Sequence, residues 1–283
     1  MQHGPGMPGD QAGHSAASTR HEVGNGRTWS STAALAENIP MRWLIAKAAR
    51  AYKGPDYTID PAIGSWALLS FATRRGAALL RCMLRGIKFS LNPRELVFVG
   101  RDVRMHNRRS INLGRGVTLG DHVLINGLAK KGITIGDSVN IGAYTIIQAT
   151  SVLWDVGEGC SIGARSGLGE FSYIGAAGGV WIGEDVIMGQ RVSFHSENHH
   201  FQRIDIPIRA QGIERKGITI ESDCWIGANV VFLDGAHVGK GCVIGAGAVV
   251  RGVIPPYSIA VGVPAGVIRS RRTEQPDMSD PQS

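Results

Sequence analysis

The chain has 283 residues and a mass of 30.2 kDa, with 39 glycines, 43% apolar residues and a formal net charge of +7. The apolar content excludes a wholly disordered chain, the glycines do not recur at every third residue as in collagen, and no apolar run is long enough for a membrane span. Four cysteines do not predict a disulfide framework, and the positive charge favours anionic partners such as phosphates or a membrane surface.

Residues 1–34 are polar and nearly free of large apolar side chains, so we expect a disordered tail there. Its start lacks the basic and apolar regions of a secretory signal, which favours a cytoplasmic protein. A helical segment is expected over 35–104. It contains a short helix over 35–52, interrupted near Pro40, and a second helix over 65–88.

The second predicted helix has two distinct faces. Cations recur on one face at spacings of seven, four and three positions, namely Arg74, Arg81, Arg85 and Lys88. Large apolar residues gather on another, namely Trp66, Leu69, Leu80, Leu84 and Ile87. We expect the apolar face to cap a solenoid and the arginines to remain in water. Contact of the basic face with the inner surface of an anionic membrane is the alternative.

From about residue 105 aliphatic or aromatic residues recur at every sixth position. The runs are Ile111, Val117, Val123; Ile135, Ile141, Ile147, Leu153; Val156, Ile162, Leu168, Ile174; Ile182, Met188, Phe194; and Ile220, Ile226, Phe232, Val238, Ile244, Val250. This beat predicts an all-β solenoid of short parallel strands over 105–254. Three repeats make one three-sided coil, and a C-terminal tail follows over 255–283. Cys224 and Cys242, separated by three repeats, should then stack as small core residues.

The beat is interrupted between Phe194 and Ile220, because the interval between these two positions is not a multiple of six. We therefore expect a loop to leave the coil over about 196–218. Long irregular insertions in a compact fold are usually functional. This loop carries the sequence SENHHF, with adjacent His199 and His200.

The repeat, the SENHHF segment and the ending VIGAGAVVRGVIPPYSIAVGVPAGVIR resemble the hexapeptide-repeat acyltransferases, in the branch of sugar and polysaccharide O-acetyltransferases. The resemblance covers about 105–270. It implies a left-handed parallel β-helix, acetyl-CoA as acyl donor, no metal cofactor and a homotrimer with active sites between subunits. No nucleic-acid partner is expected.

The resemblance also implies roles for individual residues. His199 matches the general base that deprotonates the acceptor hydroxyl, a task suited to imidazole because its pKa lies near neutral pH. His195, His200 and Glu170 are the candidate contacts of the acceptor. Gly169 stands where small sugar acetyltransferases carry an asparagine, so a surface polysaccharide or glycoconjugate is favoured as the acceptor.

For the donor, the resemblance places the pantetheine arm along the coils beside Gly227, Ala228, Ala246 and Gly247. Trp225 is a candidate contact of the same arm or a structural residue. The cations Lys240, Arg251 and Arg269 are the candidates for contact with the phosphates of acetyl-CoA.

Three other interpretations remain open. The acceptor could be a small molecule such as an antibiotic or serine, or the chain could be a β-helix scaffold without catalysis. The H-x4-H spacing of His195 and His200 also resembles the metal-binding pair of γ-class carbonic anhydrases. That chemistry needs a third histidine, and the nearest one upstream, His122, lies about four coils away.

Overall fold

The structure is a computed structural model of the chain, which describes residues 39–53, 56–86, 96–150 and 152–274. The chain divides into a unit ending at Ile39 and a unit comprising Pro40–Ser283. The predicted disordered tail over 1–34 lies outside the described residues, as do Ile87 and Lys88 of the predicted second helix.

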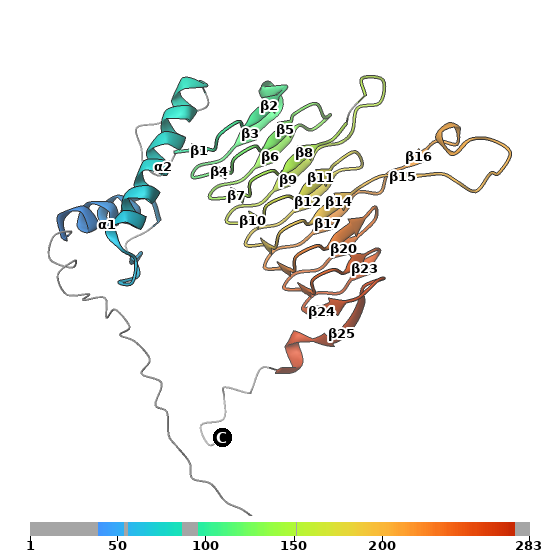
Figure 1. Cartoon of the computed structure of the whole chain (residues 1–283). Coiled ribbons are helices and arrows are strands. Elements are labelled where there is room, and N and C mark those ends of the chain that lie inside the picture. The colour runs from blue at the N-terminus through green and yellow to red at the C-terminus, as the bar shows by residue number, and fades with distance from the viewer. Residues whose placement is uncertain (1–38, 54–55, 87–95, 151, 275–283) are drawn as a thin grey trace, which may run out of the picture. The chain divides into compact units, whose positions relative to one another are not determined.

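Three parallel sheets form the main body, and the chain visits them in rotation (Figure 1). Each coil contributes one short strand to each sheet. The first sheet contains β1 (Phe98–Val99), β4 (Thr118–Leu119), β7 (Asn140–Ile141), β10 (Gly167–Leu168), β13 (Ile187–Met188), β18 (Trp225–Ile226), β21 (Val243–Ile244), β24 (Ser258–Val261) and the antiparallel β25 (Gly266–Ser270).

The second sheet contains β2 (Arg104–His106), β5 (Leu124–Asn126), β8 (Ile146–Gln148), β11 (Tyr173–Gly175), β14 (Ser193–His195), β19 (Val231–Leu233) and β22 (Val249–Val250). The third contains β3 (Ile111–Leu113), β6 (Ile133–Ile135), β9 (Cys160–Ile162), β12 (Val180–Ile182), β17 (Ile218–Ile220), β20 (His237–Val238) and β23 (Val253–Ile254). Short 3-10 turns lie at η2 (Arg108–Ser110), η3 (Ile208–Ala210) and η4 (Arg271–Glu274).

The six-residue beat produces this arrangement because it turns two side chains of each repeat inward. Ile226, for example, is fully buried, and so is the small Cys224 two positions before it. The predicted stacking of Cys224 and Cys242 agrees with the register, since Trp225 pairs with Val243. Both cysteines are buried free thiols that donate hydrogen bonds to backbone carbonyls.

The corner between the first and second sheets has a ladder of stacked rings. Tyr144 and Phe171 both adopt left-handed backbone angles, with φ of 59°. Bulky side chains rarely accept this conformation. Here their rings stack at 5.1 Å, and His122 stacks on Tyr144 at 4.7 Å. These contacts between coils offset the local backbone cost.

The regular coil of three repeats is confined to the C-terminal part of the solenoid. There Trp225 pairs with Val243, whereas Asn140 pairs with Gly167 and Ile187 with Trp225. The predictions that Leu153 and Val156 continue the beat are wrong. Leu153 is 83% exposed, and Val156 is only half-buried. The chain leaves the coil after Ala149 and returns at Cys160, so the residues between them are not held to the repeat.

Parallel strands extend beyond both predicted borders of the solenoid. β1 begins at Phe98, ahead of the expected residue 105. At the other end β24 pairs with β21, so part of the expected tail after residue 254 is a further strand of the first sheet. β25 then folds back antiparallel on β24 and closes that edge.

Two helices precede the solenoid, α1 (Ile39–Lys53) and α2 (Ser65–Leu84). α1 is anchored to the following loop by Arg42, which donates hydrogen bonds to the carbonyl oxygens of Ile59, Asp60 and Ile63. Among the described residues no helix combines the length and apolar character that crossing a bilayer requires.

α2 packs on the first coil, but with the opposite faces to those predicted. Arg81 and Arg85 donate hydrogen bonds to the carbonyl oxygens of Val99 and Val103, at 2.9 and 2.7 Å. The buried positions of the helix are Leu68, Ala78 and Cys82. The first coil has no preceding strand to satisfy its edge carbonyls, and guanidinium donors take that place. The prediction that the arginines as a group remain in water is therefore wrong, although Arg74 is exposed.

Candidate functional site

Two insertions leave the solenoid at the same corner, between the second and third sheets. Residues 149–159 join β8 to β9, and residues 196–217 join β14 to β17. Only the coil of β11 and β12 separates the two, because β8, β11 and β14 are neighbours in the second sheet. The stacking of the coils therefore brings both insertions to one site.

The second insertion is a projecting arm (Figure 1). Its base is a two-stranded antiparallel ribbon of β15 (Asn198–His199) and β16 (Ile213–Glu214), in which His199 pairs with Ile213. At the far end, Gln211 and Arg203 exchange hydrogen bonds between the Gln211 side-chain amide and the Arg203 backbone. The arm thus has a defined fold of its own and fixes His199 on a short strand.

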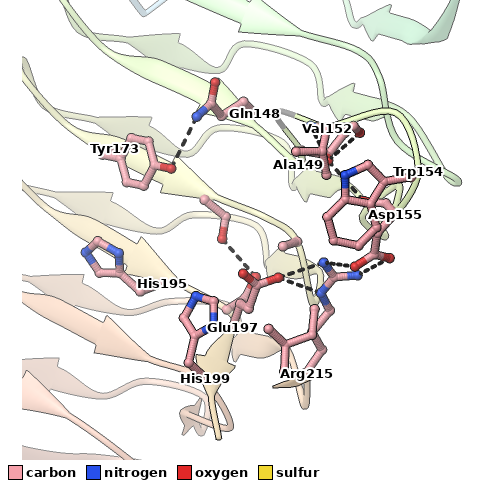
Figure 2. Close-up of a pocket in the computed structure, with 15 residues that line it drawn as sticks. Gln148, Ala149, Val152, Trp154, Asp155, Tyr173, His195, Glu197, His199 and Arg215 are labelled. Atoms are coloured by element: carbon pink, nitrogen blue, oxygen red, sulfur yellow. Dashed lines mark hydrogen bonds and ion pairs between the residues drawn. The ribbon is translucent and has the colours of Figure 1, made fainter. Parts of the chain in front are cut away.

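A pocket of about 380 Å³ lies between the two insertions and the end of the second sheet (Figure 2). Polar side chains from three successive coils face it beside one indole ring. Its lining consists of Gln148, Ala149, Thr150, Val152, Trp154, Asp155, Tyr173, Gly175, Ala177, His195, Ser196, Glu197, His199, Ile213 and Arg215.

Arg215 ties the two insertions together (Figure 2). Its guanidinium donates hydrogen bonds to both carboxylate oxygens of Asp155, at 3.0 and 2.8 Å, and to Glu197 at 2.7 Å. Burial opposes the charged form of Arg215, but the two carboxylates outweigh burial and raise its pKa. With only 19% of its side chain exposed, Arg215 fixes the wall of the pocket rather than serving as a solvated surface charge.

Two further contacts hold the base of the arm. The buried Ser196 accepts a hydrogen bond from the backbone N–H of Gly178 and donates one to the carbonyl of Gly175. Where the arm returns, the backbone N–H groups of Lys216 and Gly217 donate to the buried carboxylate of Asp234, at 2.8–2.9 Å. Both ends of the insertion are therefore anchored to neighbouring coils.

The predicted acceptor residues are only partly brought together. His199 and His195 both line the pocket, and the His195 ring lies 5.6 Å from that of Tyr173. His200 is absent from the lining, and its backbone N–H donates to the carbonyl of Gly212 within the ribbon. Glu170 is an exposed residue after β10, at the opposite corner of the second sheet.

The residues predicted for acetyl-CoA lie along several edges of the last coils. Gly227 and Ala228 stack beneath Ala246 and Gly247 at the corner between the first and second sheets, where the Gly247 N–H donates to the Ala228 carbonyl. A Cβ on Gly227 would lie 2.5 Å from the backbone nitrogen of Ala246, so only glycine permits this approach of the coils.

The remaining members of this set are spread more widely. Trp225 is 59% exposed on β18, and Arg269 pairs with Ile259 on β25. Lys240 lines a separate cleft with Trp181 and Glu221, at the corner between the third and first sheets. Arg251 is exposed after β22.

His122, considered as a third metal ligand, lies in the aromatic ladder at the other end of the second sheet from His195. Over the residues that the structure describes, no group of three or more His, Cys, Asp or Glu side chains has an arrangement suited to a metal ion.

The sequence analysis missed Trp154, Asp155 and Arg215, as well as Tyr173 and Gln148, whose side chains share a hydrogen bond of 3.3 Å at the pocket. A signal for the first insertion was available, because the interval from Ile147 to Ile162 is not a multiple of six. No comparable signal marks Arg215, because its partner Asp155 lies 60 residues away.

Comparison with known proteins gives consistent matches. Residues 217–252 match the model of the bacterial transferase hexapeptide, six repeats. A probable acetyltransferase of Mycobacterium tuberculosis is 30% identical over 82% of this chain and 62% of its own length. WbbJ of Escherichia coli, whose name describes an O-acetyl transferase of lipopolysaccharide biosynthesis, is 27% identical over 60% of this chain and 76% of its own.

The chain thus spans less than two thirds of the mycobacterial relative. Among solved structures, an N-acyltransferase from Bacillus cereus is similar with a TM-score of 0.42 and 19% identity, over 62% of this chain and 80% of that one.

Proposed function

The chain carries the hexapeptide repeat of bacterial transferases and is similar to acetyltransferases, and from this premise we propose that it transfers an acetyl group from acetyl-CoA to a carbohydrate hydroxyl. The observation that carries the proposal is the position of His199. It lines a pocket walled by two insertions that are fastened to each other through Arg215.

The chemistry follows from a neutral imidazole facing a hydroxyl. His199 accepts the hydroxyl proton as the oxygen attacks the thioester carbonyl, so a C–O bond forms and the C–S bond breaks. The imidazolium then returns the proton to the departing thiolate of coenzyme A. This step requires neither a covalent intermediate on the protein nor a metal.

The pocket composition supports a carbohydrate as the acceptor. Gln148, Tyr173, His195 and Glu197 supply hydrogen-bonding groups, and the indole of Trp154, which is 84% exposed, offers a flat apolar surface. Sugars present hydroxyl edges and an apolar face of C–H groups, which matches this combination. The name of WbbJ supports a surface polysaccharide or glycoconjugate as the acceptor class.

For the donor, we retain the edge of the last coils as the acetyl-CoA site. Gly227, Ala228, Ala246 and Gly247 would face the pantetheine arm, beside Trp225, and Lys240, Arg251 and Arg269 would supply charge for the phosphates. Lys240→Ala should weaken acetyl-CoA binding several-fold in calorimetry. An unchanged affinity would remove Lys240 from the site.

We further propose a homotrimer of left-handed coils. In the first sheet, Ile187 and Trp225 are paired neighbours that are 65% and 59% exposed, an apolar patch suited to a subunit contact. Light scattering should give three times the chain mass of 30.2 kDa. The mass of a single chain would contradict the trimer.

The decisive experiment compares two adjacent histidines. Release of the coenzyme A thiol is measured with polysaccharide, glycolipid, monosaccharide and small-molecule acceptors. With the best acceptor, His199→Ala should lower kcat by about 10²–10⁴-fold, the contribution expected of a general base. His200→Ala is the matched control and should change kcat less than about threefold, because its ring does not line the pocket. Equal rates for His199→Ala and the wild type would refute the mechanism.

A further inference from the structure

The outward face of α2 is an exposed apolar stripe. Its members Trp66, Leu69, Leu80 and Leu84 are 82%, 38%, 54% and 78% exposed. They recur at helical spacing, and the positions between them on the same face, Thr73 and Ala77, carry no charge. The stripe therefore runs the length of a 20-residue helix without interruption.

The stripe is exposed because other residues make the contact with the solenoid. Leu68, Ala78 and Cys82 form the buried side of α2, and Arg81 and Arg85 bond the edge carbonyls of the first coil. Capping of the solenoid thus leaves the large apolar side chains unused. An exposed apolar surface of this extent indicates a binding partner.

The charge around the stripe indicates the nature of that partner. Residues 39–86 contain eight lysines and arginines, at 42, 47, 50, 53, 74, 75, 81 and 85, and two acidic residues, Asp56 and Asp60. Six of the seven net positive charges of the chain are therefore concentrated here. Neither helix contains an acidic residue, and Arg74 and Lys47 are exposed on them.

We propose that α2 lies on an anionic lipid surface, with the stripe of Trp66, Leu69, Leu80 and Leu84 inserted among the acyl chains and the surrounding cations facing the headgroups. An amphipathic helix with a basic surround and an aromatic residue in its apolar face binds membranes in this orientation. The role assigned from the sequence to the arginine face thus passes to the opposite face of the helix. The inference is independent of the proposed acetyl transfer.

Two other occupants fit the charge and composition less well. A second copy of α2 would bring like charges together, which opposes association. Residues 1–38 are also a poor cover for the stripe, because their large apolar side chains are few and scattered. An anionic bilayer matches both the apolar stripe and the cations beside it.

The test is co-sedimentation of the full chain with vesicles of phosphatidylcholine alone or mixed with phosphatidylglycerol, at low and physiological salt. We expect at least tenfold stronger partition onto the phosphatidylglycerol vesicles, reduced by salt. The variant Trp66→Ser/Leu80→Ser/Leu84→Ser should lose at least tenfold in partition. Leu153→Ser is the matched control, since Leu153 is equally exposed but lies on another loop, and should bind like the wild type.

Arg74→Glu tests the charge separately and should weaken binding to phosphatidylglycerol vesicles several-fold. Circular dichroism confirms folding, and Leu84→Ser alone replaces the triple variant if that variant does not fold. A wild-type chain that stays in the supernatant with phosphatidylglycerol vesicles at low salt overturns the proposal. So does a triple variant that partitions like the wild type, or one that changes only the oligomeric mass in light scattering.

Discussion

The C-terminal coils over 218–254 and the central coils over 146–217 are built on the same repeat but differ in their corners. In the C-terminal coils each register step is short and the corners are tight, as in the pairing of Trp225 with Val243. In the central coils two corners expand into the 149–159 loop and the arm, and these expansions supply His199, Trp154 and the Arg215 ion pairs.

Beneath both regions the inward side chains are equivalent. Phe194, in the last coil before the arm, stacks at 4.8 Å on Phe232 in the first coil after it, and both are fully buried. The insertions therefore leave the core unchanged. Stability is expected to depend on the repeated interior, and activity on the corners where the repeat is interrupted.

The largest expected effect separates the two regions by stability. Ile220→Ala removes a fully buried side chain from a regular coil, where it pairs with Ile182 and Val238. The free energy of unfolding should fall by about 2–5 kcal/mol, measured by urea denaturation. The specific activity of the folded fraction should be unchanged. A loss of activity without a loss of stability would contradict the division of roles.

Arg215→Met tests whether the central region depends on its ion pairs. The change leaves Asp155 and Glu197 without their shared cation in a largely buried position, which should cost about 1–3 kcal/mol. The loosened wall should lower kcat/KM by about tenfold or more. Arg203→Met is the control, because its pair with Asp205 is exposed and should matter little. Equal behaviour of the two variants would show that Arg215 is not a clamp.

Cys160 reports on the core beneath the first insertion. Burial raises its pKa to about 12, above the value of about 8.5 in an unfolded chain. The folded protein then retains a proton that the unfolded chain loses, so the stabilisation is complete below about pH 8.5 and is lost as the pH rises toward 12.

Unfolding at pH 7 and pH 10 measures this effect. The wild type should lose about 2 kcal/mol more than Cys160→Ala between the two values, at about 1.4 kcal/mol per pH unit above 8.5. An identical loss in both proteins would mean that the core is open to solvent at this insertion.

Trp154→Ala has the smallest expected effect and bears only on the site. The ring is 84% exposed, so stability should be unchanged, while KM for the carbohydrate acceptor should rise about three- to tenfold, or about 1 kcal/mol. Leu153→Ala is the matched control, since it is exposed to the same degree but does not line the pocket. Equal KM values for these two variants would exclude Trp154 as a platform for the acceptor.

The sequence by itself determined the repeat and the position of the arm. A period of six with two inward residues has few structural solutions, so parallel coils, the buried positions from Ile220 to Val250 and the interruption after Phe194 could all be predicted. The helices were also predictable, because α1 and α2 follow from local periodicity. These features depend on neighbours within one or two turns of chain.

Only the tertiary structure decided which surfaces meet. The sequence assigned large apolar residues of α2 to the solenoid, but the first coil presents unpaired carbonyls that arginines can satisfy, and hydrogen-bonding demand prevailed over side-chain size. Likewise, Leu153 fits the period of six yet lies outside the core. The pocket joins Asp155 to Arg215 across 60 residues, a proximity set by the stacking of whole coils, which local sequence patterns do not encode.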